Sequence, residues 1–337
     1  MSELGVLLIG PGWVAGRHLS SFLENPYTEI RAIAGSRPRD KARAEAYMQE
    51  LGFRCPFHED WESALRREDI DLVSICTVNS QHFPMGLAAL EAGKHVLVEK
   101  PLCFSREQAR RLVEAAERAG VGTHVGHVVR YYPLVQHLLR FVRKGGVGEV
   151  YYCESDYWHE IKGSWKVSTE TAGSSLLMGG CHSVDIVLAM MGEECRVDEV
   201  FAFSAHPRRR MDFEYDPTIS VLMKFENGAL GKVSSSLECL MPYVFHLQVN
   251  GTEGTIRNHG IFSRHFRDSK GFMKLHAEYP DDPDVKRHPF GREIDDFVRC
   301  IREGRESPLS FRRVWPVYEV IFAAQDSVLE GRPVRLR

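Results

Sequence analysis

The sequence predicts an α/β protein, in which a domain with a doubly wound parallel sheet precedes an α+β domain with a large, mostly antiparallel open sheet. The length of 337 residues suits two domains at about 150 residues each. Apolar runs alternate with amphipathic segments in the first third, and strand patterns with Asn-Gly turns fill most of the rest. We therefore expect domains at 1–125 and 126–337.

The first domain shows five short apolar runs bounded by Gly, Pro or charged residues, as expected of buried parallel strands. Between them lie segments whose apolar residues return every three or four positions, as in helices that pack on a sheet. Ser105, followed by Glu107 and Gln108, is typical of a helix start. The predicted strands are 5–9, 30–34, 72–77, 95–98 and 121–125, and the predicted helices are 17–24, 38–51, 61–67, 83–92 and 105–119.

The second domain alternates polar and apolar residues, with Asn227-Gly228 and Asn250-Gly251 as hairpin signals. The predicted strands are 148–157, 197–205, 218–225, 231–237, 245–249 and 254–257, and the predicted helices are 134–143, 174–191, 292–303 and 311–329. We expect the last helix to pack back near the first domain. The charged segments 206–210 and 281–286 are interpreted as solvated loops.

Composition excludes several classes of protein. Hydrophobic residues make up 43% of the chain and charged ones 26%, which is typical of globular domains. The net charge of −3 gives no basic excess for binding nucleic acid or a membrane. The apolar stretch 5–14 is broken by glycine and proline and lacks a basic leader, so we expect a cytoplasmic protein. Eight scattered cysteines without a C-x-x-C pair indicate reduced thiols rather than disulfides or zinc ligands.

The motif Gly10-Pro11-Gly12-Trp13-Val14-Ala15-Gly16 lies between the first predicted strand and the first helix. Glycines at this junction allow a tight turn and let backbone N–H groups approach a pyrophosphate at the helix N-terminus. We interpret Gly10, Gly12, Trp13 and Val14 as cofactor-binding residues. The alternative is an ordinary Gly/Pro loop.

The second strand ends in Gly35-Ser36-Arg37, where NAD enzymes usually carry an acid for the ribose hydroxyls. Serine and a guanidinium suit a 2′-phosphate better, because arginine donates charge-assisted hydrogen bonds. Ser36 and Arg37 therefore favour NADP over NAD. An arginine stacked on adenine would serve NAD as well.

Two further motifs resemble those of a known family. Thr77-Val78-Asn79-Ser80-Gln81-His82 matches a T-x-N-x-x-H loop, and 92–101 matches the hallmark A-G-K-H-V-x-x-E-K-P. On these motifs the chain resembles the glucose-fructose oxidoreductase / inositol dehydrogenase / MocA (Gfo/Idh/MocA) family of oxidoreductases. The likeness continues through 126–133, 165–166, 173–185, 250–254 and 327–334, so it covers nearly the whole chain.

The resemblance implies a Rossmann domain joined to an open-sheet α/β domain, with NAD or NADP held noncovalently and a sugar or polyol as substrate. It implies that Lys100 is catalytic and reaches both the reacting hydroxyl and the nicotinamide, where an ammonium stabilises a developing alkoxide. The alternative is a surface lysine before a turn proline. The cofactor-binding residues implied by the family pattern are Thr77, Asn79, His82, Glu99, Lys100 and Arg130.

His182 matches the histidine of the family motif D-x-G-x-H-x-x-D, which implies a general acid/base. The motif's first Asp falls on Met178, whose thioether can neither orient His182 nor accept a proton. Asp185 lies three residues after His182 on the same helical face and is a candidate substrate-site residue, although the family uses it structurally. A packed core histidine is the alternative for His182.

The segment from Tyr157 to Lys166 is rich in aromatic residues. Aromatic faces stack on sugars and their polar tips bind hydroxyls, so Tyr157, Trp158, Trp165 and Lys166 are candidate substrate-binding residues. An edge loop or a subunit interface would explain the segment nearly as well. His124 and His127 have H-x-x-H spacing, but we expect no metal.

These features predict an NAD(P)-dependent oxidoreductase that acts on a secondary hydroxyl or ketone of a sugar, glycoside or cyclitol. Two alternatives remain open: a glycoside-cleaving enzyme that works by transient oxidation and elimination, and a cofactor-holding regulatory or scaffold protein without turnover. We expect a small carbohydrate-like substrate, no nucleic acid or membrane partner, and a homodimer or homotetramer.

Overall fold

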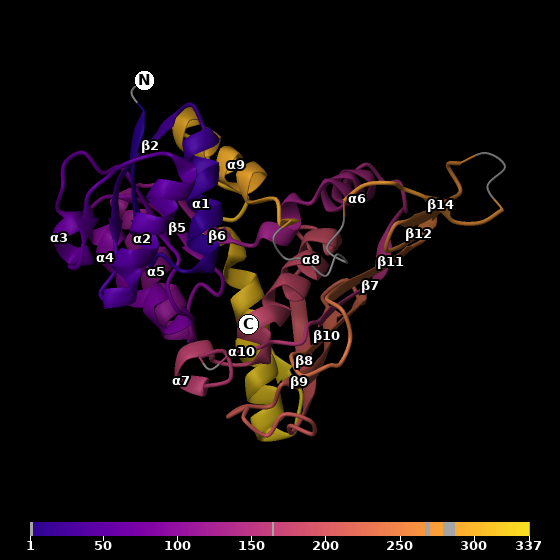
Figure 1. Cartoon of the computed structure of the whole chain (residues 1–337). Helices are drawn as coiled ribbons and strands as arrows, with labels where there is room; N and C mark the ends of the chain where they lie inside the picture. Colours follow the sequence, from indigo (N-terminus) through magenta and orange to yellow (C-terminus); the bar gives the residue numbers. More distant parts are fainter. Residues whose placement is uncertain (1–2, 164, 267–269, 279–286, 337) are drawn as a thin grey trace. The chain divides into compact units, whose positions relative to one another are not determined.

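The chain folds into two compact units, which a computed structural model describes over residues 3–163, 165–266, 270–278 and 287–336 (Figure 1). The first unit comprises Met1–His127 and Pro289–Trp315, and the second comprises Val128–His288 and Pro316–Arg337. The sequence predicts a break near residue 125, but it places residues 289–315 in the second domain. In the structure this segment packs in the first unit.

The first unit is built on a six-stranded parallel sheet with the order β3-β2-β1-β4-β5-β6. This is the doubly wound order of dinucleotide-binding domains, so the predicted parallel sheet is confirmed. The strands are β1 (Leu4–Ile9), β2 (Thr28–Ala34), β3 (Phe57–His58), β4 (Leu72–Ile75), β5 (His95–Glu99) and β6 (Thr123–Gly126). The helices are α1 (Trp13–Glu24), α2 (Pro38–Leu51), α3 (Trp61–Leu65), α4 (His82–Glu91), α5 (Arg106–Ala119) and α9 (Phe290–Glu303), with the short turn η1 (Asn79–Gln81).

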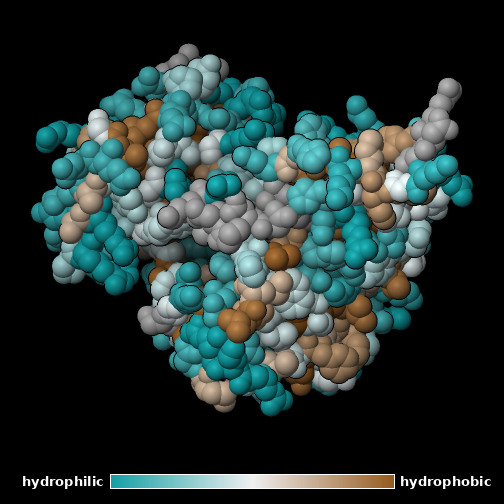
Figure 2. Space-filling model, turned by 45° about the vertical axis from the view of Figure 1, so that its right-hand side comes forward, coloured by the Kyte–Doolittle hydropathy of each residue, from teal (hydrophilic) through white to brown (hydrophobic). Residues whose placement is uncertain are grey.

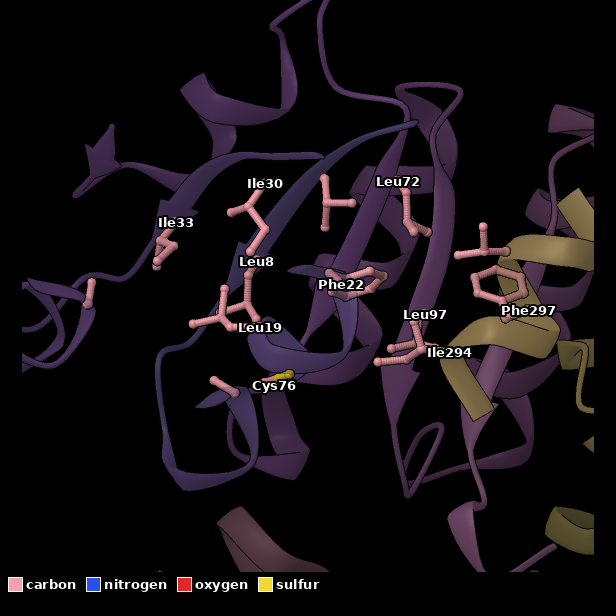
Figure 3. Close-up of a cluster of buried hydrophobic side chains, with 14 residues drawn as sticks. Leu8, Leu19, Phe22, Ile30, Ile33, Leu72, Cys76, Leu97, Ile294 and Phe297 are labelled. Atoms are coloured by element: carbon pink, nitrogen blue, oxygen red, sulfur yellow. The ribbon is translucent and has the colours of Figure 1, made fainter. Parts of the chain in front are cut away.

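Helix α9 explains why residues 289–315 belong to the first unit. Its apolar face carries Phe290, Ile294 and Phe297, all buried. Ile294 and Phe297 join the hydrophobic cluster that also contains Leu19 and Phe22 of α1 (Figure 3). Burial of such side chains contributes roughly 1.5–3 kcal/mol each, which fixes α9 to this unit despite its distance in sequence.

The second unit is built on a nine-stranded sheet with the order β14-β13-β12-β11-β7-β10-β9-β8-β15. Among the strand pairs in the described part of the chain, only β10–β7 is parallel, so the predicted mostly antiparallel sheet is confirmed. The strands are β7 (Val150–Trp158), β8 (Val197–Ala205), β9 (Thr218–Phe225), β10 (Leu230–Ser236), β11 (Val244–Gly251), β12 (Gly254–Arg257), β13 (Gly260–Ser263), β14 (Met273–Lys274) and β15 (Val334–Arg335). The helical elements are η2 (Val128–Tyr131), α6 (Pro133–Arg143), α7 (Thr169–Ala172), the π-helical turn η3 (Leu176–Gly180) and α8 (Cys181–Met191).

Helix α10 (Phe311–Glu330) contains the point at which the chain passes from one unit to the other, between Trp315 and Pro316. In the second unit its Ser327 hydroxyl accepts a hydrogen bond from the backbone N–H of Ala202 on β8 at 3.0 Å. Its end is thereby tied to the sheet of that unit.

The stretch Thr169–Met191 is long and apolar enough to cross a membrane by length and composition. However, 83% of its most apolar window is buried inside the protein, and α8 packs against β7 and β10. It is therefore the core helix of the second unit.

Hydrophilic side chains predominate on the face shown in Figure 2, where hydrophobic ones form small separate areas. All eight cysteines lie in the described part of the chain and none forms a disulfide there, in line with the predicted reduced thiols. The predicted homodimer or homotetramer stays a prediction.

We predict that Phe297→Ala lowers the free energy of unfolding by about 3–5 kcal/mol, because it leaves a cavity in the cluster against α1. Urea denaturation of the full chain measures the change. The exposed Arg299 on the same helix provides the control, and Arg299→Ala should change stability by no more than about 0.5 kcal/mol. Equal effects of the two substitutions would contradict the assignment of α9 to this core.

Candidate functional site

The glycine loop lies where β1 leaves the sheet of the first unit. Gly10 has a φ of +86°, and a Cβ added there would lie 2.5 Å from Cγ2 of Thr77, so only glycine fits without strain. The backbone N–H of Gly12 donates to Gly10 O at 2.7 Å, and the Tyr47 hydroxyl donates to Gly12 O at 2.8 Å. The tight turn predicted from the sequence is therefore present.

The loop and the start of α1 fit a dinucleotide pyrophosphate. Gly12 is the N-cap of α1 and makes no side-chain capping hydrogen bond, and the first turn holds no acidic residue. A 12-residue helix in that state presents backbone N–H groups and the positive end of its dipole to an anion. Trp13 and Val14 form this first turn, so the helix begins four residues earlier than the predicted start at residue 17. Their role toward a cofactor stays a prediction.

Ser36 and Arg37 follow β2 after Gly35, and both are exposed. Their role toward the adenine ribose stays a prediction. The Arg37 side chain pairs with Asp40 in the first turn of α2, with Nη2 3.1 Å from Oδ1 and Nε 3.1 Å from Oδ2. The guanidinium is thus directed by a buried carboxylate, which the sequence analysis did not consider.

The motif residues of β4 and β5 leave the sheet at the same edge as Gly10. Ile9 is level with Ile75 in the β1–β4 ladder, and Ile75 is level with Val98 in the β4–β5 ladder. The chain therefore turns out of the sheet at the glycine loop, at Thr77 and at Lys100 on one edge, as the carboxyl ends of parallel strands dictate.

Two polar residues of the segment after β4, Asn79 and His82, are buried. Asn79 is 3% exposed and His82 is 1% exposed. Both ring nitrogens of His82 lie against backbone oxygens: Nδ1 is 2.6 Å from Pro101 O and Nε2 is 3.3 Å from Thr77 O. His82 therefore links this loop to the turn that follows Lys100.

The predicted residues of the second unit include one tightly bound pair. Arg130 Nε and Nη2 donate to the two carboxylate oxygens of Asp185, each at 2.7 Å. Burial alone lowers the pKa of Arg130, but the charge and hydrogen bonds of Asp185 outweigh it and raise that pKa. A bidentate pair of this kind joins η2 to α8. The roles of Arg130 toward the cofactor and of Asp185 toward the substrate stay predictions.

His182 is buried in the first turn of α8, which continues directly from the π-helical turn η3. A Cβ at Gly179 would lie 2.3 Å from Cε1 of Tyr157, and one at Gly180 would lie 3.0 Å from Cβ of Ser235. These two glycines therefore allow η3 to approach β7 and β10 closely. The same approach brings the ring of His182 within 6.3 Å of the Tyr157 ring.

Tyr157 and His182 belong to a larger group of rings, which we call the phenol–imidazole cluster. The Tyr157 hydroxyl lies 2.9 Å from Nδ1 of His159, and the Tyr132 hydroxyl lies 2.7 Å from Nδ1 of His288. The Tyr243 ring lies 5.0 Å from the ring of His159 and 6.0 Å from that of His288. The members are Tyr132, Tyr157, His159, His182, Tyr243 and His288.

Four members of this cluster, Tyr132, His159, Tyr243 and His288, were not predicted as site residues. His159 lies two positions after Tyr157 in the predicted aromatic segment, so proximity in sequence was a usable signal. Tyr132 falls in a family-like segment, but Tyr243 and His288 carry no motif and are gathered only by the fold. The cluster offers aromatic faces with several hydrogen-bonding tips, which suits a polyhydroxylated ring.

The other predicted substrate residues are placed differently. Side chains alternate along a strand, so Trp158 lies on the opposite face of the sheet from Tyr157. Trp165 and Lys166 follow the end of β7, and the Lys166 ammonium lies 5.9 Å from the centre of the Trp165 ring. The structure thus places Tyr157, but not Trp158, on the face of the sheet against which α8 and His182 pack.

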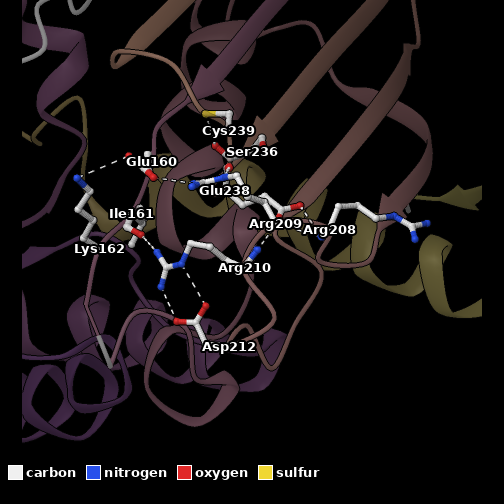
Figure 4. A network of polar contacts seen from close by, with 10 residues as sticks. All are labelled: Glu160, Ile161, Lys162, Arg208, Arg209, Arg210, Asp212, Ser236, Glu238 and Cys239. Carbon is white, nitrogen blue, oxygen red and sulfur yellow. Dashed lines mark hydrogen bonds and ion pairs between the residues drawn. The ribbon is translucent and has the colours of Figure 1, made fainter.

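The loop between β8 and β9 holds the segment that contains Trp165 and Lys166. Figure 4 shows its arginines beside the end of β7: Arg209 pairs with Glu160 at 2.7 Å, and Arg210 donates to the Ile161 carbonyl. Further along, the Tyr215 hydroxyl donates to Lys166 O at 2.5 Å.

The Glu238 carboxylate fixes this loop by accepting the backbone N–H groups of Arg208, Arg209 and Arg210 at 3.2–3.3 Å. The predicted solvated loop 206–210 is therefore exposed only in part, and the other one, 281–286, lies outside the described residues. Its side chains form a polar network that positions the segment after β7.

His124, the buried histidine of β6, lies between a serine hydroxyl and a glutamate carboxylate. His124 Nδ1 lies 2.8 Å from Ser307 Oγ, and Nε2 lies 3.3 Å from Glu293 Oε1. Among the described residues, no group of three or more His, Cys, Asp or Glu side chains is arranged to hold a metal ion.

Comparisons with known proteins agree with this geometry. Residues 4–127 match the model of an oxidoreductase family with an NAD-binding Rossmann fold, and residues 135–257 match the GFO/IDH/MocA C-terminal domain. The chain is 26% identical to D-xylose 1-dehydrogenase (NADP(+)) 2 of Haloferax volcanii, with 91% of this chain and 92% of the relative covered. It is also 26% identical to scyllo-inositol 2-dehydrogenase (NAD(+)) of Bacillus subtilis, over 88% of this chain and 86% of the relative.

Among solved structures, levoglucosan dehydrogenase in complex with NADH superimposes with a TM-score of 0.87 at 23% identity, covering 100% of both chains. A likeness at this identity supports the fold of the chain.

We predict that Arg210→Gln loosens the segment after β7, because it removes charge-assisted hydrogen bonds worth about 1.5–3 kcal/mol each. Amide hydrogen exchange of residues 159–169 should accelerate about tenfold or more. Arg208→Gln is the matched control, since Arg208 joins the network through its backbone N–H. Equal exchange in the two variants would contradict a holding role for Arg210.

Proposed function

Because the chain belongs to the Gfo/Idh/MocA family of oxidoreductases, we propose that it transfers hydride between a nicotinamide cofactor and a secondary hydroxyl or ketone of a sugar, glycoside or cyclitol. The observation that carries the proposal is the shared edge of the parallel sheet, where the glycine loop, Thr77 and Lys100 leave their strands together. An anion-binding turn and an ammonium at one sheet edge suit a dinucleotide and a reacting oxygen.

The bound cofactor would accept or donate the hydride at its nicotinamide ring. Backbone N–H groups from Gly12 to Val14 would hold the pyrophosphate. The Lys100 ammonium would stabilise negative charge on the carbinol oxygen as the C–H bond breaks, which is an electrostatic role that needs a fixed cation.

His182 would exchange the hydroxyl proton, since an imidazole can both accept and return a proton near neutral pH. Met178 provides no carboxylate at the position where the family has one. Hydroxyl groups of the substrate would instead form hydrogen bonds with the phenol and imidazole groups of the phenol–imidazole cluster. Within that cluster, the Tyr157 hydroxyl and His159 Nδ1 are hydrogen-bonded to each other.

The proposal is supported by relatives whose names include dehydrogenases of D-xylose and scyllo-inositol. One of these names carries NADP(+) and the other NAD(+), so the relatives do not decide between the two cofactors. For this chain we propose NADP, on the evidence of the exposed Ser36-Arg37 pair after β2.

We expect NADPH and NADH to bind at submillimolar concentration in a fluorescence titration of the full chain. Initial rates with D-xylose, levoglucosan and inositols should reveal turnover through NAD(P)H absorbance. Failure to bind either cofactor would remove the proposal. Cleavage of a nitrophenyl glycoside without net change in NAD(P)H would favour the transient-oxidation alternative, and binding without any turnover would favour the regulatory or scaffold alternative.

Lys100→Ala should lower kcat about 10²–10³-fold with little change in the Kd of NADPH, because it removes one donor to the developing oxyanion. Stopped-flow rates and fluorescence binding measure the two quantities. Lys224→Ala, on an exposed position of β9, provides the control and should leave both unchanged. Unaltered turnover in the Lys100 variant would exclude the catalytic role.

Arg37→Ala should weaken NADPH about tenfold or more and NADH much less, since a charge-assisted hydrogen bond to a 2′-phosphate contributes about 1.5–3 kcal/mol. The exposed Arg39 supplies the control: Arg39→Ala should affect both cofactors little. Equal weakening of NADPH and NADH by the Arg37 substitution would refute the phosphate assignment.

A further inference from the structure

A backbone carbonyl of the glycine loop is held by a tyrosine from another helix of the first unit. Tyr47 lies in the third turn of α2, and its hydroxyl donates to Gly12 O at 2.8 Å. Gly12 is the N-cap of α1, and Trp13 is the first residue of that helix. The hydroxyl from α2 therefore contacts the loop at the point where α1 begins.

This hydrogen bond fixes the direction of one peptide group. The C=O of Gly12 and the N–H of Trp13 belong to the same planar trans peptide unit, so the two bonds point in opposite directions. A hydroxyl that holds the oxygen therefore also fixes the direction of the Trp13 N–H. That N–H is one of the first-turn groups that have no partner inside the helix and can bind an anion.

The ring of Tyr47 packs against α1 at a glycine. Gly16 lies one turn after Gly12, and a Cβ added at Gly16 would lie 2.6 Å from Cε1 and 2.9 Å from Cζ of Tyr47. Glycine is disfavoured inside a helix relative to alanine. At this position α1 therefore has a residue that weakens the helix but lets the phenol ring approach the Gly12 carbonyl.

Gly12 differs from the glycines on either side of it. A Cβ added at Gly12 would lie 3.7 Å from Cys76 O and 3.9 Å from Gly10 O, which are ordinary van der Waals distances. Its φ of −77° is open to any residue. Packing within the protein therefore requires glycine at 10 and 16 but not at 12, where a missing side chain leaves room for a group that approaches the loop from outside.

The N-terminal end of α2 carries the arginine proposed for the 2′-phosphate. Arg37 is the N-cap of α2 and pairs with Asp40. A Cβ added at Gly35 would lie 2.7 Å from Cβ of Asp40, so this end of α2 also packs closely on a glycine. One helix thus holds Arg37 at its start and Tyr47 two turns further on, each beside a different part of the proposed dinucleotide site.

We propose that Tyr47 is a positioning residue for cofactor binding, whose hydroxyl holds the Gly12 carbonyl so that the first-turn N–H groups of α1 are directed at the pyrophosphate. This inference rests on the proposed binding of a dinucleotide. The pyrophosphate is common to NADPH, NADH and ADP, so Tyr47 contributes to the affinity for all three. Arg37, in contrast, contributes only where a 2′-phosphate is present.

Tyr47→Phe in the full chain keeps the ring and removes the hydroxyl. Its Kd for NADPH, NADH and ADP, measured by isothermal titration calorimetry, should rise by the same factor of about threefold to tenfold. The Kd for 2′-AMP, which has no pyrophosphate, should stay at the wild-type value. Tyr27→Phe is the control, because Tyr27 is 45% exposed and follows the opposite end of α1. With an active substrate, the cofactor KM should rise in Tyr47→Phe with kcat unchanged.

Two further measurements test the same contact. In protein labelled with ¹⁵N-tryptophan, the NMR signal of the Trp13 amide should move in Tyr47→Phe and not in Tyr27→Phe, because this amide shares its peptide unit with the Gly12 carbonyl. Gly16→Ala favours the helix but displaces the Tyr47 ring, so it should weaken ADP about as much as Tyr47→Phe. The double variant should show little further loss, since both substitutions remove one contact.

Wild-type affinity for ADP in Tyr47→Phe or in Gly16→Ala would overturn the proposal. Equal weakening of 2′-AMP and ADP, or an unmoved Trp13 signal in Tyr47→Phe, would do the same. The NMR measurement needs no ligand. If the wild-type chain binds none of NADPH, NADH and ADP, the proposed function fails, and the Trp13 signal still decides whether Tyr47 orients the loop.

Discussion

The register of the parallel strands β1, β4 and β5 is the constraint on which the site in the Rossmann domain depends. Because β1, β4 and β5 end at the same height, their following residues must leave the sheet together, whatever those residues are. The chain places a positive-φ glycine after the first, a polar loop after the second and a lysine after the third. Backbone hydrogen bonding between the strands therefore brings these three loops to one end of the sheet. The side chains on the loops determine what can bind or react there.

In the second unit, the site depends on the close packing of the π-helical turn η3 against the sheet. Glycines at 179 and 180 let a π-helical turn lie against β7 and β10, where any side chain would collide with Tyr157 or Ser235. A π turn shifts the residues that follow it relative to a regular helix, and such turns are frequent at functional sites. Here it delivers His182 to the rings of the phenol–imidazole cluster, although Met178 replaces the acid expected from the family pattern.

Much of the fold could be predicted from the sequence, because buried strands and amphipathic helices repeat with different periods. Strands β3, β13, β14 and β15 were missed, since segments of two residues, or of four in β13, are too short to show a clear period. The affiliation of α9 was also missed, because an apolar helical face does not say which sheet it covers. Of the site, the motif-bearing residues could be found, whereas Tyr243 and His288 have no local signal and depend on long-range packing. The 3.1 Å contact between His18 Nε2 and Glu99 Oε1 could not be predicted either, because it joins residues that are far apart in the sequence.

The return of Pro289–Trp315 to the first unit makes the nucleotide domain discontinuous. Residues 128–288, which hold eight of the nine strands of the second sheet, are inserted between its two pieces. A ribosome therefore synthesises residues 128–288 of the second unit before α9 emerges to cover α1. Until then, Phe22 and Leu19 lack part of their apolar covering. The domain that begins the chain can therefore be completed only after most of the second unit has been synthesised, so the two units must mature together.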